Sequence, residues 1–479
     1  MPRIKRKKTV TRSAPRSART AKPAHELPPE ATRDERRAAG KALRDRVPRE
    51  QHGDWTTPSG RPDPVDLVVA SSEGRIPELI PIRYGRMSVS PFTFYRGTAL
   101  NMAADLSFTP STGIRAQLCG DCHLMNFGGF ATPERRVVFD INDFDETLPG
   151  PWEWDVKRLA ASFVHAARSN GFSAAAERDA AMECVRSYRE HMLEYAKMRA
   201  LDVWYSRIDV EEVLAFLSDK ETVARLRSRL AKAAAHSTPD SDFPKLAESH
   251  GDRFAIRDAP PLVYHHREIN LDDEGHDILG SVARYVTTLQ DDRRKLLERY
   301  RLVDFALKVV GVGSVGTFCG ILLMMAEDDD PLFLQAKESH PSVLEKYVGK
   351  SVYANHGQRV VEGQRLMQAA SDLFLGWAEG KRGRQFYVRQ LRDMKVKPLV
   401  EAFNRATMND YATLCGWGLA RAHARSGDAA MIAGYLGKRD VFDRAIARFA
   451  RSYADQAERD HAAFIAAIRT GRIEARMED

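Results

Sequence analysis

Apolar residues recur every three or four positions along several long stretches of this chain, which is the period of an α-helix with one buried face. The pattern predicts helices over residues 155–168, 174–200, 220–236, 283–300, 356–378, 397–425 and 439–468. Residues 303–338 instead alternate or run apolar between glycine and acidic turns, as consecutive strands do. Shorter strands are predicted over residues 113–119, 135–143 and 385–392. We therefore expect an α+β protein, rich in helices, with one small antiparallel sheet.

The chain of 479 residues is long enough for one large two-lobed domain or for two or three ordinary domains. It is 43% hydrophobic and 29% charged, a balance typical of globular proteins. No apolar run approaches the length of a membrane-spanning helix, and the first residues lack the apolar core of a secretory signal. Five cysteines, an odd number, argue against a disulfide scaffold and favour a reducing compartment, so we expect a cytoplasmic protein.

The formal net charge of +7 is concentrated at the beginning of the chain. Nine lysines and arginines lie within residues 1–22, and the first acidic residue is Glu26. Apolar periodicity is absent there, so residues 1–50 are predicted to form a basic, disordered arm. Such an arm is suited to contact nucleic acid or an anionic surface, and a solvated leader without a specific partner is the alternative. The rest of the chain is near charge balance and is not expected to bind nucleic acid.

The candidate chemistry begins with Asp121, which is followed by Asn126 and, after a short strand, by Asp143. This order and spacing are typical of a phosphotransferase site, where the first aspartate takes the proton of the acceptor hydroxyl and the later residues hold Mg²⁺. We predict Asp121 as the general base and Asn126 and Asp143 as magnesium ligands, because amide and carboxylate oxygens suit this hard cation. Asp145 and Asp140 are further candidate ligands. The alternative is an acidic loop whose polar residues only satisfy turns.

The segment Cys-Gly-Asp-Cys-His-Leu-Met-Asn at residues 119–126 resembles the Gly-Asp-x-His-x-x-Asn loop of the aminoglycoside and choline kinase branch of the protein kinases. The resemblance implies that His123 braces this loop, although a hydrogen-bonded core histidine is the alternative. It also implies that Asp155 opens a helix and accepts hydrogen bonds from the loop backbone. Asp143-Phe144-Asp145 stands in the place of the kinase Asp-Phe-Gly triplet, with aspartate replacing glycine.

The residues expected to form the nucleotide-binding half of such a site come later in the chain. No lysine lies between Lys41 and Lys157, so the usual kinase order cannot supply the lysine that binds the ATP phosphates unless Lys41, in the charged leader, itself serves. Residues 311–316 read Gly-x-Gly-x-x-Gly between apolar strands, and the next hairpin ends in Ala336-Lys337. Glycines let backbone N–H groups approach phosphate oxygens. The predicted ATP contacts are Gly311, Gly313, Ser314, Gly316, Thr317 and Lys337, with Glu362 or Glu345 as the partner of the lysine.

A dinucleotide-binding fingerprint is the alternative interpretation of the glycine turn, but it requires a helix that opens at the third glycine. Thr-Phe-Cys-Gly-Ile-Leu-Leu follows Gly316 and reads as a strand. We therefore predict a circularly permuted, two-lobed, protein-kinase-like fold. Its parts are the arm (1–50), a catalytic-loop and helical lobe (51–300), a nucleotide-binding lobe (301–395) and a second helical part (396–479). Permutation is tolerated when the chain ends lie in exposed connections.

Three strings, at residues 94–97, 120–128 and 355–365, resemble a bacterial family catalogued as domain of unknown function 2252, over roughly residues 50–470. That label implies little about function, so the functional prediction depends on the motifs. They predict an ATP- and Mg²⁺-dependent phosphotransferase that acts on a hydroxyl of a small molecule or protein. Transfer of AMP on the same fold, a non-catalytic nucleotide-binding scaffold and a metal-dependent hydrolase remain open alternatives.

Two further groups of residues have a chemical and a structural interpretation. Arg83, Arg86 and Arg96 precede the catalytic loop and either meet a phosphate or an acidic substrate, or serve the fold. Cys119-x-x-Cys122 has the spacing of a metal or redox pair, but no second pair accompanies it, so we do not expect it to bind metal.

Overall fold

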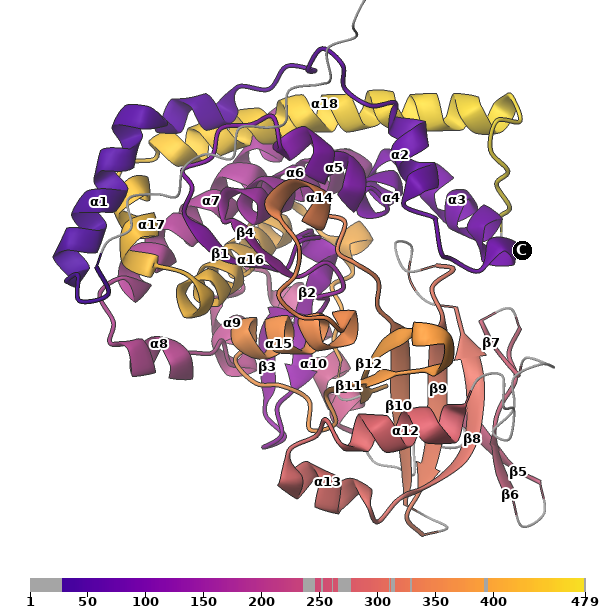
Figure 1. The fold of residues 1–479 in the computed structure, drawn as a ribbon. Coiled ribbons are helices and arrows are strands. Elements are labelled where there is room, and N and C mark those ends of the chain that lie inside the picture. The colour runs from indigo at the N-terminus through magenta and orange to yellow at the C-terminus, as the bar shows by residue number, and fades with distance from the viewer. Residues whose placement is uncertain are drawn as a thin grey trace, which may run out of the picture.

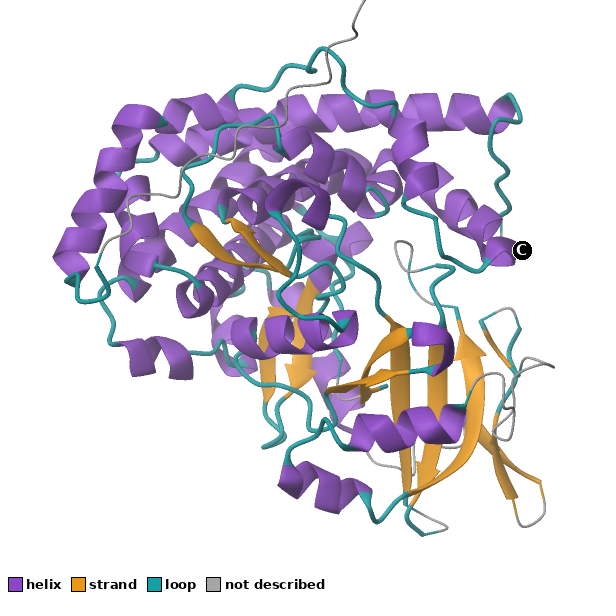
Figure 2. Cartoon of the chain, in the orientation of Figure 1, coloured by secondary structure: helices purple, strands orange, loops and turns teal. Residues whose placement is uncertain are grey.

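The structure is a computed structural model that describes residues 28–235, 246–250, 253–260, 262–265, 277–309, 311, 315–327, 330–391 and 395–477. Gly313, Ser314 and the basic residues 1–22 lie outside these described residues. Figures 1 and 2 show a large helical part beside a smaller part built on an antiparallel sheet. The expectation of a mixed, helix-rich α+β protein is thus confirmed. None of the described helices combines the length and the apolar character needed to cross a membrane.

Long helices form the core of the helical part. α7 (Ala174–Tyr195) packs along α16 (Arg405–Ser426), and α6 (Glu153–Ser169) packs against α7 and α18 (Val441–Arg469). The other helices here are α1 (Arg33–Arg46), α2 (Pro64–Ala70), α3 (Ile80–Ser88), α4 (Pro91–Arg96), α5 (Ala99–Leu106), α8 (Ala200–Tyr205), α9 (Val210–Phe216), α10 (Lys220–Ala235) and α17 (Ala429–Leu436). Most of these helices share one large cluster of buried residues, while α2 and α3 pack with the end of α18 in a smaller cluster.

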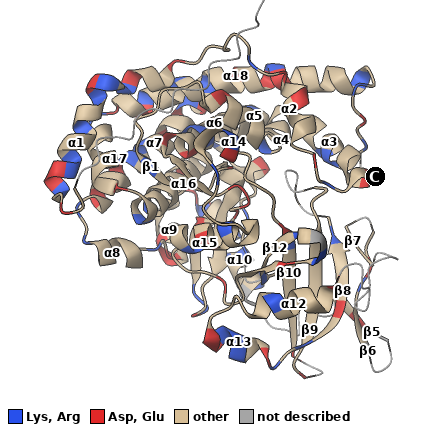
Figure 3. Cartoon of the chain, viewed as in Figure 1, with Lys and Arg blue, Asp and Glu red and all other residues tan. Residues whose placement is uncertain are grey.

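The prediction of a disordered arm up to residue 50 is wrong for residues 33–46, which form α1. Thr32 and Glu35 make a capping box that satisfies the free N–H groups at the start of the helix. Gly40 lets α1 approach α17 so closely that a Cβ at this position would overlap the backbone of Met431. Figure 3 shows that α1 carries charges of both signs. The charged composition therefore concealed a helix that is stabilised by tertiary packing.

The sheet contains six strands in the order β11-β12-β10-β9-β8-β7, and every pair of neighbours is antiparallel. Its strands are β7 (Val263–Tyr264), β8 (Arg301–Lys308), β9 (Cys319–Met325), β10 (Pro331–Glu338), β11 (Gly376–Glu379) and β12 (Gln385–Gln390). β8, β9 and β10 follow one another as a meander, and β12 inserts between β10 and β11. Nearby lie the pair β5 (Ala247–His250) and β6 (Arg253–Ile256), and the helices α12 (Ile278–Val286), α13 (Asp291–Leu297) and α15 (His356–Met367). The short helix α14 (Glu345–Val348) lies instead against β4 in the helical part.

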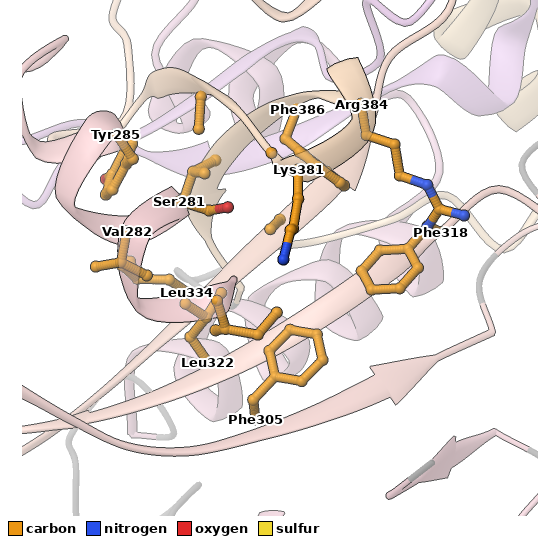
Figure 4. Close-up of a pocket in the computed structure, with 15 residues that line it drawn as sticks. Ser281, Val282, Tyr285, Phe305, Phe318, Leu322, Leu334, Lys381, Arg384 and Phe386 are labelled. Carbon is orange, nitrogen blue, oxygen red and sulfur yellow. The ribbon is translucent and has the colours of Figure 1, made fainter. Parts of the chain in front are cut away.

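Alternate side chains of β10 face opposite sides of the sheet, as the period of a strand requires. Ala336 lines a mostly apolar pocket of about 80 Å³ between the sheet and α12. Figure 4 shows Tyr285 of α12 and Phe305 and Leu322 of the strands around this pocket. Lys337 faces the other side, toward the helical part. The position of Lys337 in the strand therefore determines which face of the sheet carries the candidate chemistry.

Several predicted boundaries are wrong for reasons that the structure explains. The helix expected over 283–300 is two helices, α12 and α13, and these cover the sheet, so the described residues between 247 and 300 belong with the sheet and not with the helical part. The helix expected over 356–378 ends at Met367, because Gln368 and Ala369 donate hydrogen bonds to the strand β3 (Val137–Ile141), and β11 follows. The helix expected from residue 397 begins at Arg405, where Asn404 caps it.

Two short strand pairs carry the candidate loop. β1 (Arg115–Leu118) pairs with β4 (Leu148–Pro151), and β2 (Phe127–Ala131) pairs with β3. The loop at residues 119–126 connects β1 to β2, and the acidic segment at residues 142–147 connects β3 to β4. Phe127 is paired with Ile141, and the backbone N–H of Asn142 donates to the carbonyl of Asn126 at 2.7 Å. The two polar segments consequently lie side by side.

Candidate active site

Side chains of both parts of the molecule line one cleft of about 1120 Å³. The helical part contributes Asp121, His123, Asn126, Asp143 and Asp145, and the sheet contributes Gly311, Thr317 and Lys337. These two groups are encoded nearly two hundred residues apart, and the structure brings Lys337 and Asp143 into the same cleft, as a permuted site requires. Of the predicted site residues within the described part of the chain, Gly316 and Glu362 do not line it.

One of the contacts that join the two parts is an ion pair between Lys337 and Asp145. Lys337 Nζ lies 2.6 Å from Asp145 Oδ2, and the Tyr387 hydroxyl donates to Asp145 Oδ1 at 2.7 Å. Lys337 and Tyr387 are opposite each other in the β10–β12 register, so the sheet presents both to the same carboxylate. Tyr387 was not predicted, although residues 385–392 were expected to be a strand.

Burial and charge act in opposite directions on this pair. Burial alone would lower the pKa of Lys337, but the Asp145 carboxylate outweighs it and the pKa is raised. Burial alone would raise the pKa of Asp145, but Lys337 and the Tyr387 hydroxyl lower it to about 2. Both groups are therefore charged at neutral pH, and a cation stands at the edge of the sheet where it faces the acidic segment.

The predicted pairing of Lys337 with Glu362 is wrong. Glu362 accepts a hydrogen bond from Arg365 Nη1 at 3.3 Å on the same helix, α15. Glu345 does line the cleft, but its Oε1 lies 3.8 Å from Nδ1 of His356, whose pKa is lowered by burial. The sequence pattern identified the helix that follows the lysine strand but could not show which of its faces is turned toward the lysine.

α15 supports the acidic segment through an arginine instead. The buried Arg359 guanidinium donates to the carbonyl oxygens of Asp145, Thr147 and His340 at 2.7–2.9 Å. One guanidinium thereby fixes three carbonyl groups from two segments. Arginine suits this role because its planar guanidinium carries several N–H donors in a fixed geometry. This helix therefore positions Asp145 through its backbone, while Lys337 contacts its side chain.

Helix α6 supports the loop that carries Asp121 through hydrogen bonds. The backbone N–H groups of Cys119 and Gly120 donate to the carboxylate of Asp155 at 2.8 and 3.1 Å, which confirms the structural role predicted for Asp155. Gly120 has φ +86°, and a Cβ there would overlap the carbonyl of Glu146 in the acidic segment. Only glycine allows the two segments to approach this closely.

Asp121 is held by an arginine that the sequence analysis missed. Arg158 Nε donates to Asp121 Oδ1 at 2.7 Å, and Arg158 Nη2 donates to the carbonyl of Tyr95 at 3.1 Å. The second carboxylate oxygen, Oδ2, lies 3.8 Å from His123 Nε2. The Asp121 side chain keeps 23% of its surface exposed, so the carboxylate is anchored yet accessible. Arg158 follows Asp155 by one helical turn of α6, a spacing that could have indicated a shared face.

His123 organises the loop through its backbone. Its N–H donates to the carbonyl of Asp121 at 2.9 Å, and its own carbonyl accepts from the N–H of Asn126 at 2.8 Å. Burial lowers the pKa of the His123 ring to about 3, so the ring is neutral. Nδ1 of this ring is buried and has no hydrogen-bond partner among the described residues, so the ring is not the fully bonded core histidine of the alternative interpretation.

Asn126, Asp143 and Asp145 present oxygen donors from the two adjacent segments. Asn126 Nδ2 donates to the carbonyl of Asp121 at 2.7 Å, which orients the side-chain amide. Burial and the neighbouring charge of Asp145 raise the pKa of Asp143, and a divalent cation would relieve that repulsion. This donor set is of the kind that Mg²⁺ prefers, and a bound cation would share the Asp145 carboxylate with Lys337 and Tyr387, which contact both of its oxygens. Asp140 does not belong to it, because its carboxylate is buried and bound to Arg421 at 2.6 Å.

The glycine turn is attached to the helical part by residues that no motif predicted. Arg75 Nη1 donates to the carbonyl of Val315 at 2.6 Å, and the N–H of Ile76 donates to the carbonyl of Gly316 at 2.7 Å. Arg86 Nη1 donates to the carbonyl of Gly311. Gly316 has φ +88°, which glycine adopts without strain.

Arg83 and the cysteine pair have structural roles. Arg83 is buried and donates to Ser72 Oγ and to the carbonyl of Gly97, so it serves the fold. Cys119, Cys122 and Asp155 bring ligand atoms within 4.8 Å of one another. The oxygens of Asp155 are already used by the loop backbone, and burial raises the pKa of Cys122 to about 12, so this cluster supports the loop and does not favour a metal.

The molecule is thus a mixed α+β protein with a polar cleft between a helical part and an antiparallel sheet. Residues 75–467 match the model of a family described as an uncharacterized protein conserved in bacteria, the domain of unknown function 2252, and the chain belongs to this family. Neither the curated proteins nor the solved structures contain a match to this chain.

Proposed function

We propose that this chain is an ATP- and Mg²⁺-dependent phosphotransferase with a circularly permuted, kinase-like fold, which acts on a hydroxyl group of a small molecule or protein. The observation that carries the proposal is the Lys337–Asp145 ion pair, made across one cleft that also holds Asp121, Asn126 and Asp143. Lysine, two carboxylates, an amide and a separate aspartate are the polar groups that phosphoryl transfer uses.

The order of elements in the sheet supports the same proposal. β8 precedes the glycine turn, β9 and β10 form the next hairpin, and β10 ends at the lysine. The helices α14 and α15 follow, and the strands β11 and β12 then complete this side of the sheet. Kinases arrange a glycine-rich loop, a strand lysine and a following helix in this order. What differs is that the loop with Asp121 comes earlier in the chain.

Each of these residues has a task in the proposed reaction. The acceptor oxygen attacks the γ-phosphorus, the bond from that phosphorus to the β,γ-bridging oxygen breaks, and ADP leaves. The hydroxyl proton passes to Asp121 Oδ2, while Arg158 holds the other oxygen in place. Lys337 contributes positive charge to the phosphates. Mg²⁺, held by Asn126, Asp143 and Asp145, would supply neutralisation of phosphate charge when bound.

Ligand-dependent thermal stabilisation of the purified protein tests this proposal. ATP with Mg²⁺ is expected to raise the melting temperature of the wild-type protein, because a ligand that binds only the folded state stabilises it. Lys337→Ala is expected to lose this shift. Lys346→Ala removes another lysine of the same cleft and serves as the matched control. An unchanged shift in Lys337→Ala would contradict the proposal.

Product analysis separates the proposed reaction from its alternatives. Mass spectrometry of a modified acceptor distinguishes added phosphate from added AMP. A non-catalytic nucleotide-binding scaffold predicts ATP binding without turnover and a silent Asp121→Asn substitution. A hydrolase that uses the acidic cluster alone predicts no effect of Lys337→Ala on activity.

A further inference from the structure

The charge of the cleft points to the kind of acceptor that it takes. Among the described residues that line it, eleven are lysine or arginine and seven are aspartate or glutamate. A concave surface with an excess of one sign of charge concentrates ligands of the opposite sign. In the proposed function, Lys337 and the neighbouring cations of the sheet bind the nucleotide. The cations at the other end, beside Asp121, are left for the acceptor.

Arg96 is the residue that distinguishes this end of the cleft. It ends α4, lines the cleft and lies within electrostatic reach of Asp121. Its Nε is buried and has no hydrogen-bond partner among the described residues. Arg83 Nε also lacks a partner among the described residues, but the Nη1 and Nη2 groups of Arg83 are bound to Ser72 and to the carbonyl of Gly97. Arg158 donates through its Nε to Asp121.

A second buried polar atom lies on the same side of the cleft. His123 is 4% exposed and lines the cleft, and its Nδ1 has no hydrogen-bond partner within the described part of the chain. A buried polar group without a partner is costly to the fold, and native proteins satisfy nearly all of them with protein, water or ligand atoms. Two such groups beside Asp121 therefore indicate a ligand with hydrogen-bond acceptors.

We propose that the acceptor is a hydroxyl compound that carries an anionic group, a carboxylate or a phosphate, and that Arg96 and His123 bind this group beside Asp121. The inference builds on the proposed phosphotransferase and names its substrate class. A guanidinium matches the two oxygens of a carboxylate or phosphate with parallel hydrogen bonds. Fixing the anion there holds the hydroxyl of the same molecule close to Asp121, which is the positioning that phosphoryl transfer needs. Cationic acceptors are repelled by the same surface.

Binding of inorganic phosphate tests the subsite independently of any reaction. The titration is made by calorimetry on the full chain carrying Lys337→Ala, which removes the main phosphate-binding cation of the nucleotide site. One phosphate is expected to bind per chain. Adding Arg96→Gln should weaken binding at least about tenfold, and Arg96→Lys, which keeps the charge but loses the paired donors, should weaken it less. Equal binding in the Arg96→Gln protein overturns the proposal.

Arg229→Gln is the matched control, because Arg229 lines the same cleft from α10 and is also partly exposed. It is expected to leave phosphate binding unchanged. An equal loss in Arg229→Gln would mean that the whole basic surface attracts the ion, and the assignment to Arg96 would fall. The melting temperature of each variant without ligand shows that the fold is retained.

Three alcohols then test the acceptor class with the wild-type enzyme. Glycerol, glycerate and glycerol 3-phosphate share hydroxyl groups and differ in charge. ADP release in the presence of ATP and Mg²⁺ is expected to rise with one or both of the anions and not with glycerol, and the more effective anion identifies carboxylate or phosphate recognition. Arg96→Gln should raise KM for that anion with a smaller effect on kcat. If glycerol stimulates ADP release as much as the anions do, the proposed anionic acceptor is overturned. If the protein binds phosphate but not ATP, only the proposed phosphotransferase activity is overturned.

Discussion

Lys337 and Asp145 form a buried contact between two charges that are far apart in sequence. Lys337 is 3% exposed, and removing its partner would leave an ammonium group without compensation in a place that water hardly reaches. The Tyr387 hydroxyl strengthens the pair, because it donates to the oxygen of Asp145 that the lysine does not contact. The stability of the cleft therefore depends on the pair as a unit rather than on either residue.

We expect Asp145→Asn to lower the free energy of unfolding by about 3 kcal/mol, the lower end of the cost of breaking a buried ion pair, because Asp145 retains some solvent contact. Lys337→Met combined with Asp145→Asn should be less destabilised than the sum of the two single variants. Urea unfolding of the four proteins without nucleotide gives the coupling energy. Additive effects would show that the pair contributes nothing to stability.

The pH dependence of the pair follows from the direction of its shift. The pKa of Asp145 is lowered to about 2 in the folded protein, whereas an unfolded aspartate titrates near about 3.9. The stabilisation is therefore complete above about pH 4 and is lost as the pH falls toward 2. We expect the difference in unfolding free energy between wild type and Asp145→Asn to shrink as the pH falls below about 4. A constant difference down to the lowest pH at which both proteins fold would contradict this assignment.

At the scale of elements, each polar segment is supported by one helix. α6 holds the Asp121 loop through Asp155 and Arg158, and α15 holds the acidic segment through Arg359. Periodicity predicted that both helices exist, since their apolar faces are buried. Periodicity did not predict these supporting contacts. A helical pattern shows which face of the helix is buried, but not which polar groups of other segments contact that face.

The close approach of the two segments makes Gly120 sensitive to substitution. Gly120→Ala adds both the cost of a positive φ and a clash with the carbonyl of Glu146. Gly171 has φ +71° but nothing within 4 Å of an added Cβ, so Gly171→Ala pays only the conformational cost of about 1 kcal/mol. We expect Gly120→Ala to be destabilised by clearly more than this control in urea unfolding. It should also lose binding of ATP. Equal losses in the two variants would mean that the segments separate freely.

At the scale of the whole molecule, residues 75–86 connect the beginning of the chain to the glycine turn. Arg75, Ile76 and Arg86 donate hydrogen bonds to three carbonyls around that turn. In the proposed permuted fold the nucleotide-binding part follows the catalytic loop, and this segment reconnects the two parts across the cleft. The turn is thus restrained from outside its own hairpin.

We expect Arg75→Met to loosen the glycine turn without unfolding the protein. Amide hydrogen exchange over residues 315–318 should become faster, and the Kd for ATP should rise about fivefold, the equivalent of one hydrogen bond of about 1 kcal/mol. Arg472→Met removes an exposed arginine that pairs with Asp63 and Asp66 away from the cleft, and it should change neither quantity. Unaltered exchange in Arg75→Met would show that the contact does not restrain the turn.

The amino-acid sequence by itself determined the helical and strand periods, the Asp121–Asn126 loop, the acidic segment and the lysine at the end of a strand. These are local patterns, since backbone period and turn chemistry depend on residues close together in the chain. Only the tertiary structure decided that Asp145, rather than Glu362, is the partner of Lys337, and that arginines hold the two segments in place. Lys337 and Asp145 are 192 residues apart, and their meeting depends on how the sheet packs on the helical part, which no local pattern encodes.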